Sequence, residues 1–360
     1  MNTDINAKIE KTDIKEITQD TVWQRMPMRI QDSHKGTYGK LLCVAGSSRY
    51  RGAAALTAEG ALRGGCGIVT LASVEPVFAS IQPRLPECIL LSCLPDEKGG
   101  ISEANAESLK AELSNDYAAL LMGPGMGNTP DTGSLVRTLT QNAECTVILD
   151  ADALNALTLP VCEKSLSNDM KKSQISSASK QQILSDSQKQ RSSDSEKQRL
   201  EKQSFFNSEK QRRSSCRLPS PLSGHQLIIT PHPGEMARLC GCSIADIKAN
   251  REEIALGFAE ENNCIVVLKE HRTLIASPNG QLWRNTSGNS GLARGGSGDI
   301  LAGMMASFAA QGMKPVDAAI CAVWLHGAAA ERCSRRKSET IMLPHDIFED
   351  LGQMFLENDR

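Results

Sequence analysis

The chain has 360 residues, with 40 Lys and Arg against 42 Asp and Glu, and a formal net charge of −2 at pH 7. This near balance argues against a partner recognised through bulk charge, so we expect no nucleic acid as ligand. The 12 cysteines are scattered without a CxxC pair, which argues against a zinc site and against a disulfide framework. The N-terminus is polar, and no apolar run reaches the roughly 18 to 20 residues of a membrane span, so we expect a cytoplasmic protein without a membrane partner.

We assign residues 1–22 to a polar N-terminal tail and residues 23–360 to a single domain. Within this domain, continuously apolar runs alternate with segments of helical spacing. The runs that predict strands are residues 40–47, 67–73, 118–122, 145–150, 225–230 and 264–268, and the clearest helical segments are 52–65, 299–311 and 315–333. Strands without polar alternation are typical of a sheet covered on both faces. The pattern therefore predicts a three-layer α/β fold, with a mostly parallel central sheet and helices on both faces.

Residues 163–223 interrupt this pattern. They include 17 Ser, 8 Gln and 20 charged residues but no Gly, and a short theme recurs as DSQKQR, DSEKQR and NSEKQR. Such a segment buries too little apolar area to offset its ordering entropy, so we predict a disordered, low-complexity insertion inside the one domain. With 13 Lys and Arg against 7 Asp and Glu, it is either a basic tether or, as we favour, a tolerated surface insertion, because loop length costs little stability.

Polar and glycine-rich sequences follow several predicted strands, where an open parallel sheet binds ligands. The loop GPGMGN, residues 123–128, is either a plain turn or a place where the backbone approaches a ligand closely. It does not match the dinucleotide-binding fingerprint, and the absence of GxxxxGK[ST] from the sequence argues against a P-loop enzyme. After the next strand, Asp150 and Asp152 are candidate helix caps. Whichever of the two does not cap, together with Asn155, is a candidate to face a ligand.

A histidine and a polar run follow the last two predicted strands of this series. His232 lies between two prolines in TPHPGE, which fixes the backbone on both sides and favours a positioning role, with general base as a weaker hypothesis. Glu235 falls in the first turn of the next helix, where the helix dipole favours a carboxylate, and it is our only guess at a metal ligand. The polar run is either a solvated hairpin tip or a source of cations and a hydroxyl for a nucleotide. It consists of Lys269, Glu270, His271, Arg272 and Thr273.

The most informative sequence is NSGLARGGSGDILAG, residues 289–303, in which glycines precede an aspartate at a helix start. Glycines in this place let backbone N–H groups converge on an anion, and the helix dipole favours the same charge. A carboxylate is out of place beside a phosphate unless it takes a proton from a hydroxyl while the phosphoryl group rests on the amides. Asp299 therefore predicts the chemistry of a small-molecule kinase without a P-loop.

Together these motifs resemble one family. GGSGD resembles the signature of ribokinase-like enzymes. With HKGTYGKLLCVAGS, GPGMGN, LDADALNAL and ITPHPGEMARL it resembles the ADP/ATP-dependent NAD(P)H-hydrate dehydratases, over about residues 30–332 outside the insertion. The resemblance implies a ribokinase-like fold and a lyase of nucleotide repair that acts on the S epimer of hydrated NADH or NADPH. ADP or ATP phosphorylates the ring hydroxyl, and phosphate, a far better leaving group than hydroxide, is then eliminated.

The resemblance also implies roles for single residues. Asp299 would be the base on the substrate hydroxyl, and Gly298 would hold the transferred phosphate. ADP or ATP, with Mg²⁺, would lie against residues 269–273, and the metal ligands stay unassigned. The residues implied at the hydrated dinucleotide are Ala54, Gly127, His232 and Asp299, with Asn155 and Asn289 as weaker candidates.

Two features depart from the family pattern. The family usually has Lys-Gly where this chain has Lys269-Glu270, and the added carboxylate weakens polyphosphate binding unless His271 and Arg272 compensate. The insertion precedes the strand that leads to His232, close to the expected site. We further expect a separate protein to supply the epimerase activity, and the Ala-rich helices are compatible with a homo-oligomer.

Two other hypotheses stay open at this point. One is a ribokinase-like vitamin kinase, which would phosphorylate hydroxymethylpyrimidine, hydroxyethylthiazole or pyridoxal and release the phosphorylated product. The other is a non-catalytic nucleotide-binding module. Asp299 argues against the second hypothesis, because binding an anion does not require a carboxylate there.

Overall fold

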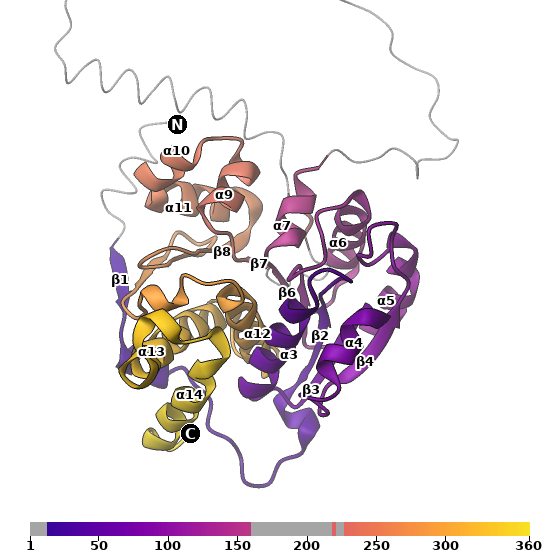
Figure 1. Ribbon diagram of the computed structural model, residues 1–360. Helices are drawn as coiled ribbons and strands as arrows, with labels where there is room; N and C mark the ends of the chain where they lie inside the picture. Colours follow the sequence, from indigo (N-terminus) through magenta and orange to yellow (C-terminus); the bar gives the residue numbers. More distant parts are fainter. Residues whose placement is uncertain (1–12, 160–217, 221–226) are drawn as a thin grey trace, which may run out of the picture.

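The structure, a computed structural model, describes residues 13–159, 218–220 and 227–360. Ten strands form one sheet in the order β1-β10-β9-β8-β7-β6-β5-β2-β3-β4 (Figure 1). The strands are β1 Ile14–Ile17, β2 Lys40–Val44, β3 Ile68–Val74, β4 Ile89–Cys93, β5 Ala119–Met122, β6 Thr146–Leu149, β7 Leu227–Ile229, β8 Cys264–Leu268, β9 Leu274–Ala276 and β10 Leu282–Asn285. Among them only β9 runs against the others. The predicted mostly parallel sheet is confirmed.

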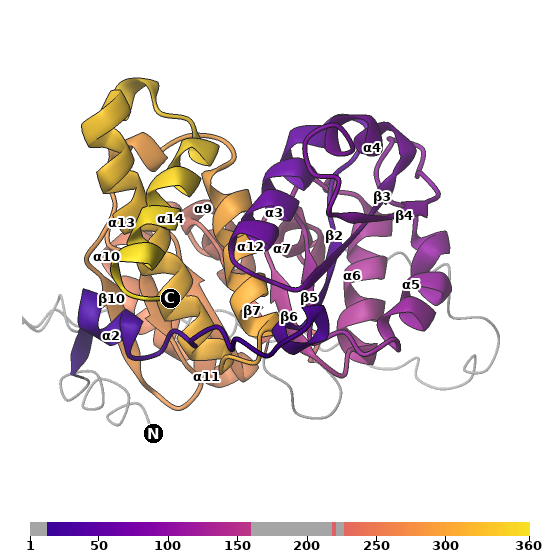
Figure 2. The same ribbon diagram turned by 90° about the horizontal axis from the view of Figure 1, so that it is seen from below.

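Helices cover both faces of the sheet, and Figure 2 shows α3 and α12 on one side of the strands and α5 and α6 on the other. The α-helices are α2 Gln19–Trp23, α3 Arg51–Arg63, α4 Glu75–Ile81, α5 Ala106–Leu113, α6 Pro130–Asn142, α7 Asp152–Leu157, α9 Pro233–Cys240, α10 Ile244–Ala249, α11 Arg251–Asn262, α12 Ser297–Ala310, α13 Pro315–Ile341 and α14 Ile347–Glu357. Parallel strands need such crossovers, which bury both faces of the sheet. This explains why the central strands are apolar throughout.

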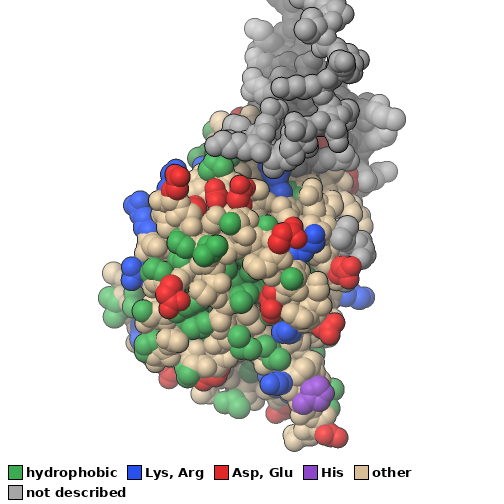
Figure 3. Space-filling model, turned by 90° about the vertical axis from the view of Figure 1, so that its right-hand side faces the viewer, with side chains coloured by type: hydrophobic (Ala, Val, Ile, Leu, Met, Phe, Trp, Pro, Cys, Tyr) green, Lys and Arg blue, Asp and Glu red, His purple; other side chains and the backbone are tan. Residues whose placement is uncertain are grey.

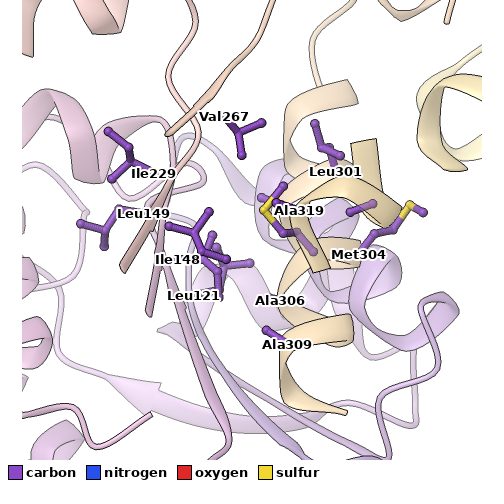
Figure 4. Packing of buried hydrophobic residues seen from close by; sticks show 14 of the residues in the cluster. Leu121, Ile148, Leu149, Ile229, Val267, Leu301, Met304, Ala306, Ala309 and Ala319 are labelled. Atoms are coloured by element: carbon purple, nitrogen blue, oxygen red, sulfur yellow. The ribbon is translucent and has the colours of Figure 1, made fainter. Parts of the chain in front are cut away.

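Helix α12 packs into the middle of the molecule. Buried residues of this helix, among them Leu301, Met304, Ala306 and Ala309, belong to one core cluster with strand residues such as Leu121 and Ile148 (Figure 4). Against α3 the two backbones approach closely, since a Cβ on Gly303 would lie 2.2 Å from the Thr57 carbonyl oxygen. The glycines on this side of α12 therefore serve helix packing, and they hold the N-terminus of α12 at the carboxyl ends of the strands.

The N-terminal boundary differs from the one we predicted. Residues 14–17, inside the expected tail, form edge strand β1, which pairs in parallel with β10. In α2, Val22 and Trp23 are buried, and Trp23 contacts Phe355 edge to face at 5.4 Å between ring centroids. The strand sequence IKEI is short and half charged, as edge strands often are, so its local pattern does not distinguish it from a polar tail.

Most of the predicted insertion, residues 163–223, lies outside the described residues. Near its end, Leu218 is buried in the core, and its backbone N–H donates to Asn262 Oδ1 at 3.1 Å. At least Leu218, inside the predicted bounds, therefore packs against the domain, and the bounds of the insertion stay a prediction. The high average polarity of the segment masks one apolar position that packs against the domain.

The surface shown in Figure 3 carries acidic and basic side chains interspersed, with neither sign gathered in a patch. This fits the balanced charge of the whole chain. Among the described residues, no helix has both the length and the apolar character needed to cross a bilayer.

Candidate functional site

A cavity of about 930 Å³ lies where several strands end. Its walls come from the loops after β6, β7 and β8, from the segment between β10 and α12, and from one face of α13. Predicted site residues that line it are His232, Lys269, Glu270, His271, Arg272, Thr273, Asn289, Gly298 and Asp299. This is the edge at which open α/β sheets bind ligands. The structure thus brings together residues that are up to 67 positions apart in the sequence, from 232 to 299.

The glycine-rich segment before α12 forms an open helix N-terminus. Gly296 is the N-cap, with φ 98°, a conformation that favours glycine, and no side chain caps the helix. The first N–H groups of a helix lack intrahelical acceptors, and the helix dipole attracts an anion to them. A Cβ on Gly298 would meet Lys269 Nζ at 3.5 Å and Asp150 Oδ2 at 3.9 Å, so these amides lie beside a charged pair.

Asp150 and Lys269 form that pair. Asp150 is 1% exposed, and its Oδ1 accepts hydrogen bonds from Thr230 Oγ1 at 2.6 Å and from Lys269 Nζ at 2.5 Å. Burial opposes the charge on Lys269, but the carboxylates of Asp150, Glu235 and Asp299 outweigh it and raise the pKa of the lysine. Lys269 therefore stays protonated at neutral pH and is held at the start of α12.

Neither aspartate after β6 caps the following helix, contrary to our prediction that one of them does. The N-cap of α7 is Ala151, with φ 48°, and it makes no side-chain cap bond. Asp152 Oδ2 instead accepts the backbone N–H of Gly127 at 2.8 Å, which ties the β6 loop to the GPGMGN loop. A sequence pattern could not have found this contact, because the two residues lie on different strand ends.

Asp299 occupies the first turn of α12 beside this pair. Burial raises the pKa of Asp299 to about 7, repulsion from Asp150 adds to the rise, and Lys269 opposes it. A general base works best when its pKa lies near the operating pH. The carboxylate is therefore suited to accept a proton from a substrate hydroxyl.

His232 is held by a capping box at the start of α9. Its Nδ1 accepts the Gly234 N–H at 3.0 Å, Glu235 Oε2 accepts the His232 N–H at 2.8 Å, and Nε2 lies 3.3 Å from Glu235 Oε1. Burial lowers the pKa of His232, as do Lys269 and Arg238. Because both ring nitrogens are engaged, the weaker hypothesis of a general base does not fit, whereas a positioning role does.

Glu235 is committed to this capping box. It is 5% exposed, and burial raises its pKa to about 7. A half-protonated carboxyl group that already accepts two hydrogen-bond donors is a poor metal ligand, so the structure argues against our guess for Glu235.

The turn after β8 resolves the concern about Glu270. Its carboxylate pairs with Lys248 Nζ at 3.4 Å and with Arg251 Nε at 3.3 Å. The guanidinium of Arg251 also donates to the backbone carbonyl of Arg272 at 3.0 Å, which supports the left-handed residue there (φ 57°). The compensating cations therefore come from α10 and α11 rather than from His271 and Arg272.

Three predicted substrate-site residues do not line this cavity. Ala54 is fully buried in α3, and Asn155 Oδ1 accepts a hydrogen bond from Arg238 Nε at 2.9 Å. Gly127, with φ 93°, has open space where a Cβ would be, apart from Thr129 Cγ2 at 3.9 Å. All three lie on the segments that follow β2, β5 and β6.

Ser297 and His326 are among the cavity residues that the sequence reasoning missed. Ser297 and His326 are 7% and 5% exposed, and Ser297 Oγ and His326 Nε2 have no hydrogen-bond partner among the described residues. The only signal was a single histidine inside the apolar run AVWLHGAAA, which by itself is more typical of a core residue. Helix α13 packs against α12, and His326 lies in the wall of the cavity.

A sequence model of NAD(P)H-hydrate dehydratase matches residues 41–173 and 206–353. The chain belongs to the NAD(P)H-hydrate dehydratase family. It is 31% identical over 339 residues to the ADP-dependent (S)-NAD(P)H-hydrate dehydratase of Bacillus subtilis, covering 94% of this chain and 96% of that protein. It is 34% identical over 305 residues to the enzyme of the same name from Neisseria meningitidis, covering 84% and 80%.

The family also includes longer proteins. A bifunctional NAD(P)H-hydrate repair enzyme from Moorella thermoacetica is 32% identical over 327 residues, and the match covers 91% of this chain but 51% of that protein. Among solved structures, the B. subtilis ADP/ATP-dependent NAD(P)H-hydrate dehydratase co-crystallised with ATP and Mg²⁺ has a TM-score of 0.70 at 28% identity, covering 96% and 99%. A ribokinase-like superfamily protein from Enterococcus faecalis, at 21% identity and a TM-score of 0.68, confirms the ribokinase-like fold.

Proposed function

We propose that this member of the dehydratase family repairs the S epimer of hydrated NADH or NADPH in a reaction that consumes ADP or ATP. The observation that carries the proposal is Asp299, a carboxyl group with a pKa of about 7 at an open helix N-terminus next to Lys269. Two relatives that the match covers over 96% and 80% of their own length are named ADP-dependent (S)-NAD(P)H-hydrate dehydratases. Their names support the same substrate and co-substrate for this chain.

The residues divide the first step between them. Asp299 takes the proton of the ring hydroxyl, and the hydroxyl oxygen attacks the terminal phosphorus of the nucleotide as the bond to its leaving oxygen breaks. The N–H groups at Gly298 and the charge of Lys269 stabilise the negative charge on the phosphoryl oxygens. Asp150 holds the lysine through a hydrogen bond, and Thr230 in turn donates a hydrogen bond to Asp150.

The second step removes phosphate. The carbon–oxygen bond of the phosphorylated ring breaks, a neighbouring ring carbon loses a proton, and the double bond of the dihydronicotinamide is restored. The anion site at α12 that receives the phosphoryl group in the first step stabilises the departing phosphate in the second.

The donor set fits a nucleotide-borne Mg²⁺. Among the described residues, no group of three or more His, Cys, Asp and Glu side chains forms a metal cluster. Mg²⁺ usually needs only one or two carboxylates beside phosphates and water, and Asp150 Oδ2, which lies beside Gly298, offers a hard oxygen atom at the cavity. When bound, the ion neutralises charge on the phosphates.

For the hydrated dinucleotide we propose the space between Asp299 and the GPGMGN loop. Gly127 has room at its α-carbon, and the Asp152 bond fixes its amide. The proposed substrate contacts also include Ala54 and Asn155, from the family resemblance, and His232, which lines the neighbouring cavity. The rigid capping box suits His232 to contact the substrate without taking a proton from it.

The vitamin-kinase alternative is less favoured, because the family model and the most similar named relatives are dehydratases. The bifunctional relatives are about twice as long as the matched region. We propose that epimerisation of the R form is carried out by a separate protein, and that the enzyme acts in the cytoplasm.

The proposal is tested by incubating the protein with hydrated NADH, Mg²⁺ and either ADP or ATP. Recovery of dihydronicotinamide absorbance is expected, and no recovery with either nucleotide would refute it. Asp299→Asn should lower turnover by about 10²- to 10⁴-fold, as for loss of a general base, while nucleotide affinity by calorimetry stays within a few-fold. Glu107→Gln, an exposed carboxylate on α5, is the matched control and should be fully active.

A further inference from the structure

Arg238 is an exposed cation in the last turn of α9, and the proposed mechanism gives it no role. Its Nε donates to Asn155 Oδ1 at 2.9 Å, so the group that holds it is a neutral amide. Other arginines of the chain, such as Arg332 and Arg336, pair with carboxylates. No ion pair within the described part of the chain includes Arg238. Its positive charge is therefore held in place but not neutralised there.

A short series of contacts connects Arg238 to the space proposed for the hydrated dinucleotide. Helix α9 packs against α7, where Asn155 lies (Figure 1). Asp152 lies three residues before Asn155 on α7, and side chains at this spacing are neighbours on one face of a helix. Asp152 Oδ2 accepts the backbone N–H of Gly127, the residue with open space at its α-carbon. The guanidinium therefore stands beside α7, two side chains away from the GPGMGN loop.

The charges around this space make a cation valuable. Asp150 and Asp152 follow β6, and Asp299 lies in the first turn of α12, so carboxyl groups gather here. The charge of Lys269 is balanced by its contact with Asp150. A hydrated dinucleotide carries negative charge on both phosphates of its pyrophosphate, and the NADPH form adds a 2′-phosphate. Arg238 supplies the opposite charge, and the planar guanidinium can donate two parallel hydrogen bonds to one phosphate.

We propose that Arg238 binds a phosphate group of the hydrated dinucleotide and so holds the substrate on the α7–α9 side of the site. This inference rests on the proposed function, because it names a contact for the same substrate. Asn155 accepts from Nε and orients the guanidinium, and the terminal nitrogens Nη1 and Nη2 are the donors for phosphate oxygens. ADP has no such contact, since its proposed place is the cavity at Lys269 and Gly298, which Arg238 does not line.

The test measures kcat and KM of Arg238→Gln for NADH hydrate, NADPH hydrate and ADP. KM should rise about 10- to 100-fold for the hydrates, as for the loss of charge-assisted hydrogen bonds, while kcat and the KM for ADP stay within about 3-fold. A rise with both hydrates assigns Arg238 to the pyrophosphate, and a rise with NADPH hydrate alone assigns it to the 2′-phosphate. Arg238→Lys keeps the charge without the planar fork and should lie between the two proteins. The wild-type KM should also rise more steeply with salt than that of Arg238→Gln.

The matched control is Arg63→Gln, because Arg63 is likewise exposed and lies in the last turn of its helix, α3. It removes the same interaction with a helix dipole, so both variants should melt alike, and its KM values should match those of the wild type. An unchanged KM for both hydrates in Arg238→Gln overturns the inference, and so does an equal rise in the KM for ADP. If the wild-type protein repairs neither hydrate, the proposed function itself fails, whereas repair with unaltered KM in Arg238→Gln rejects only the role of Arg238.

Discussion

Two glycine-rich loops follow strands of the same sheet, and they serve different purposes. In residues 123–128, a Cβ on Gly123 would lie 1.7 Å from the Asp150 carbonyl oxygen, and one on Gly125 would lie 2.8 Å from Ala53 Cβ. In residues 295–298, a Cβ on Gly296 would lie 2.5 Å from Leu56 Cδ1. One on Gly295 would meet nothing within 4 Å, and one on Gly298 would meet only the Lys269 and Asp150 side chains, beyond 3.4 Å. The first loop is mostly closed by protein, and the second opens onto a cavity.

The comparison shows that a glycine cluster after a strand does not by itself indicate a ligand. Gly123 is required because the backbone of the neighbouring loop occupies the place of its side chain, whereas Gly298 leaves space beside a lysine. Gly127 is the exception in the first loop, because a Cβ there would have open surroundings. This is why we keep Gly127 alone of these glycines as a substrate contact.

The largest effect is expected for Gly123→Ala. The added Cβ would collide with the Asp150 carbonyl, and φ is 127°, so the backbone has to move. We expect a loss of about 4 kcal/mol in unfolding free energy or no soluble protein at all, a cost reserved for buried clashes. Thermal melting and soluble yield measure it. A stable, active variant would show that this loop is not packed as described.

The activity should also depend on pH through Asp299. Its carboxyl group must be deprotonated to act as base, so kcat/KM should fall about 10-fold for each pH unit below its pKa near 7.

The raised pKa of Asp299 has the opposite effect on the free energy of unfolding. The protonated form is favoured in the folded state, so this contribution to stability is lost as the pH rises from about 4 through 7. Asp150→Asn removes a source of the rise and should move the activity limb to lower pH; an unmoved limb would contradict the coupling.

Gly298→Ala should separate binding from folding. The new Cβ meets only side-chain atoms at ordinary contact distance, so the melting temperature should change by no more than about 3 °C. It projects toward the proposed phosphate position, and nucleotide affinity should fall about 10-fold. The control is Gly352→Ala, because a Cβ on Gly352 would meet nothing within 4 Å. Gly241→Ala would not serve, because the φ of 65° at Gly241 is strained for alanine. Equal losses of stability in Gly298→Ala and Gly123→Ala would erase the contrast between the loops.

The smallest loss of stability is expected from deleting residues 163–216, whose end stops short of the buried Leu218. A shorter connection costs less entropy to close, about 0.6 kcal/mol for each halving of its length, so the free energy of unfolding should stay unchanged or rise by at most about 2 kcal/mol. Denaturant unfolding measures it, with Leu218→Ala as the comparison. That substitution should cost more, about 2 kcal/mol, because it removes a core side chain. A deletion that costs more than Leu218→Ala would mean that the segment contributes to the domain.

Local sequence patterns predicted the central strands because strands buried on both faces read as apolar runs in any context. They also predicted α12 and α13 from helical spacing, with the second starting at Pro315 as expected. They missed β1, β4 and β10. Those strands lie toward the edges of the sheet, where alternation with polar residues and short length make the pattern weak.

By itself, the sequence determined the fold class and the family resemblance, and it gave Asp299 as the proposed base. The fold class follows from composition and spacing, and the resemblance and Asp299 follow from short motifs, all of which act over a few residues. Only the tertiary structure decided that Asp150 holds Lys269, that Arg251 and Lys248 neutralise Glu270, and that His326 faces the cavity. Such pairings join residues on different strands and helices, and the geometry that brings them within hydrogen-bonding distance exists only once the sheet has formed.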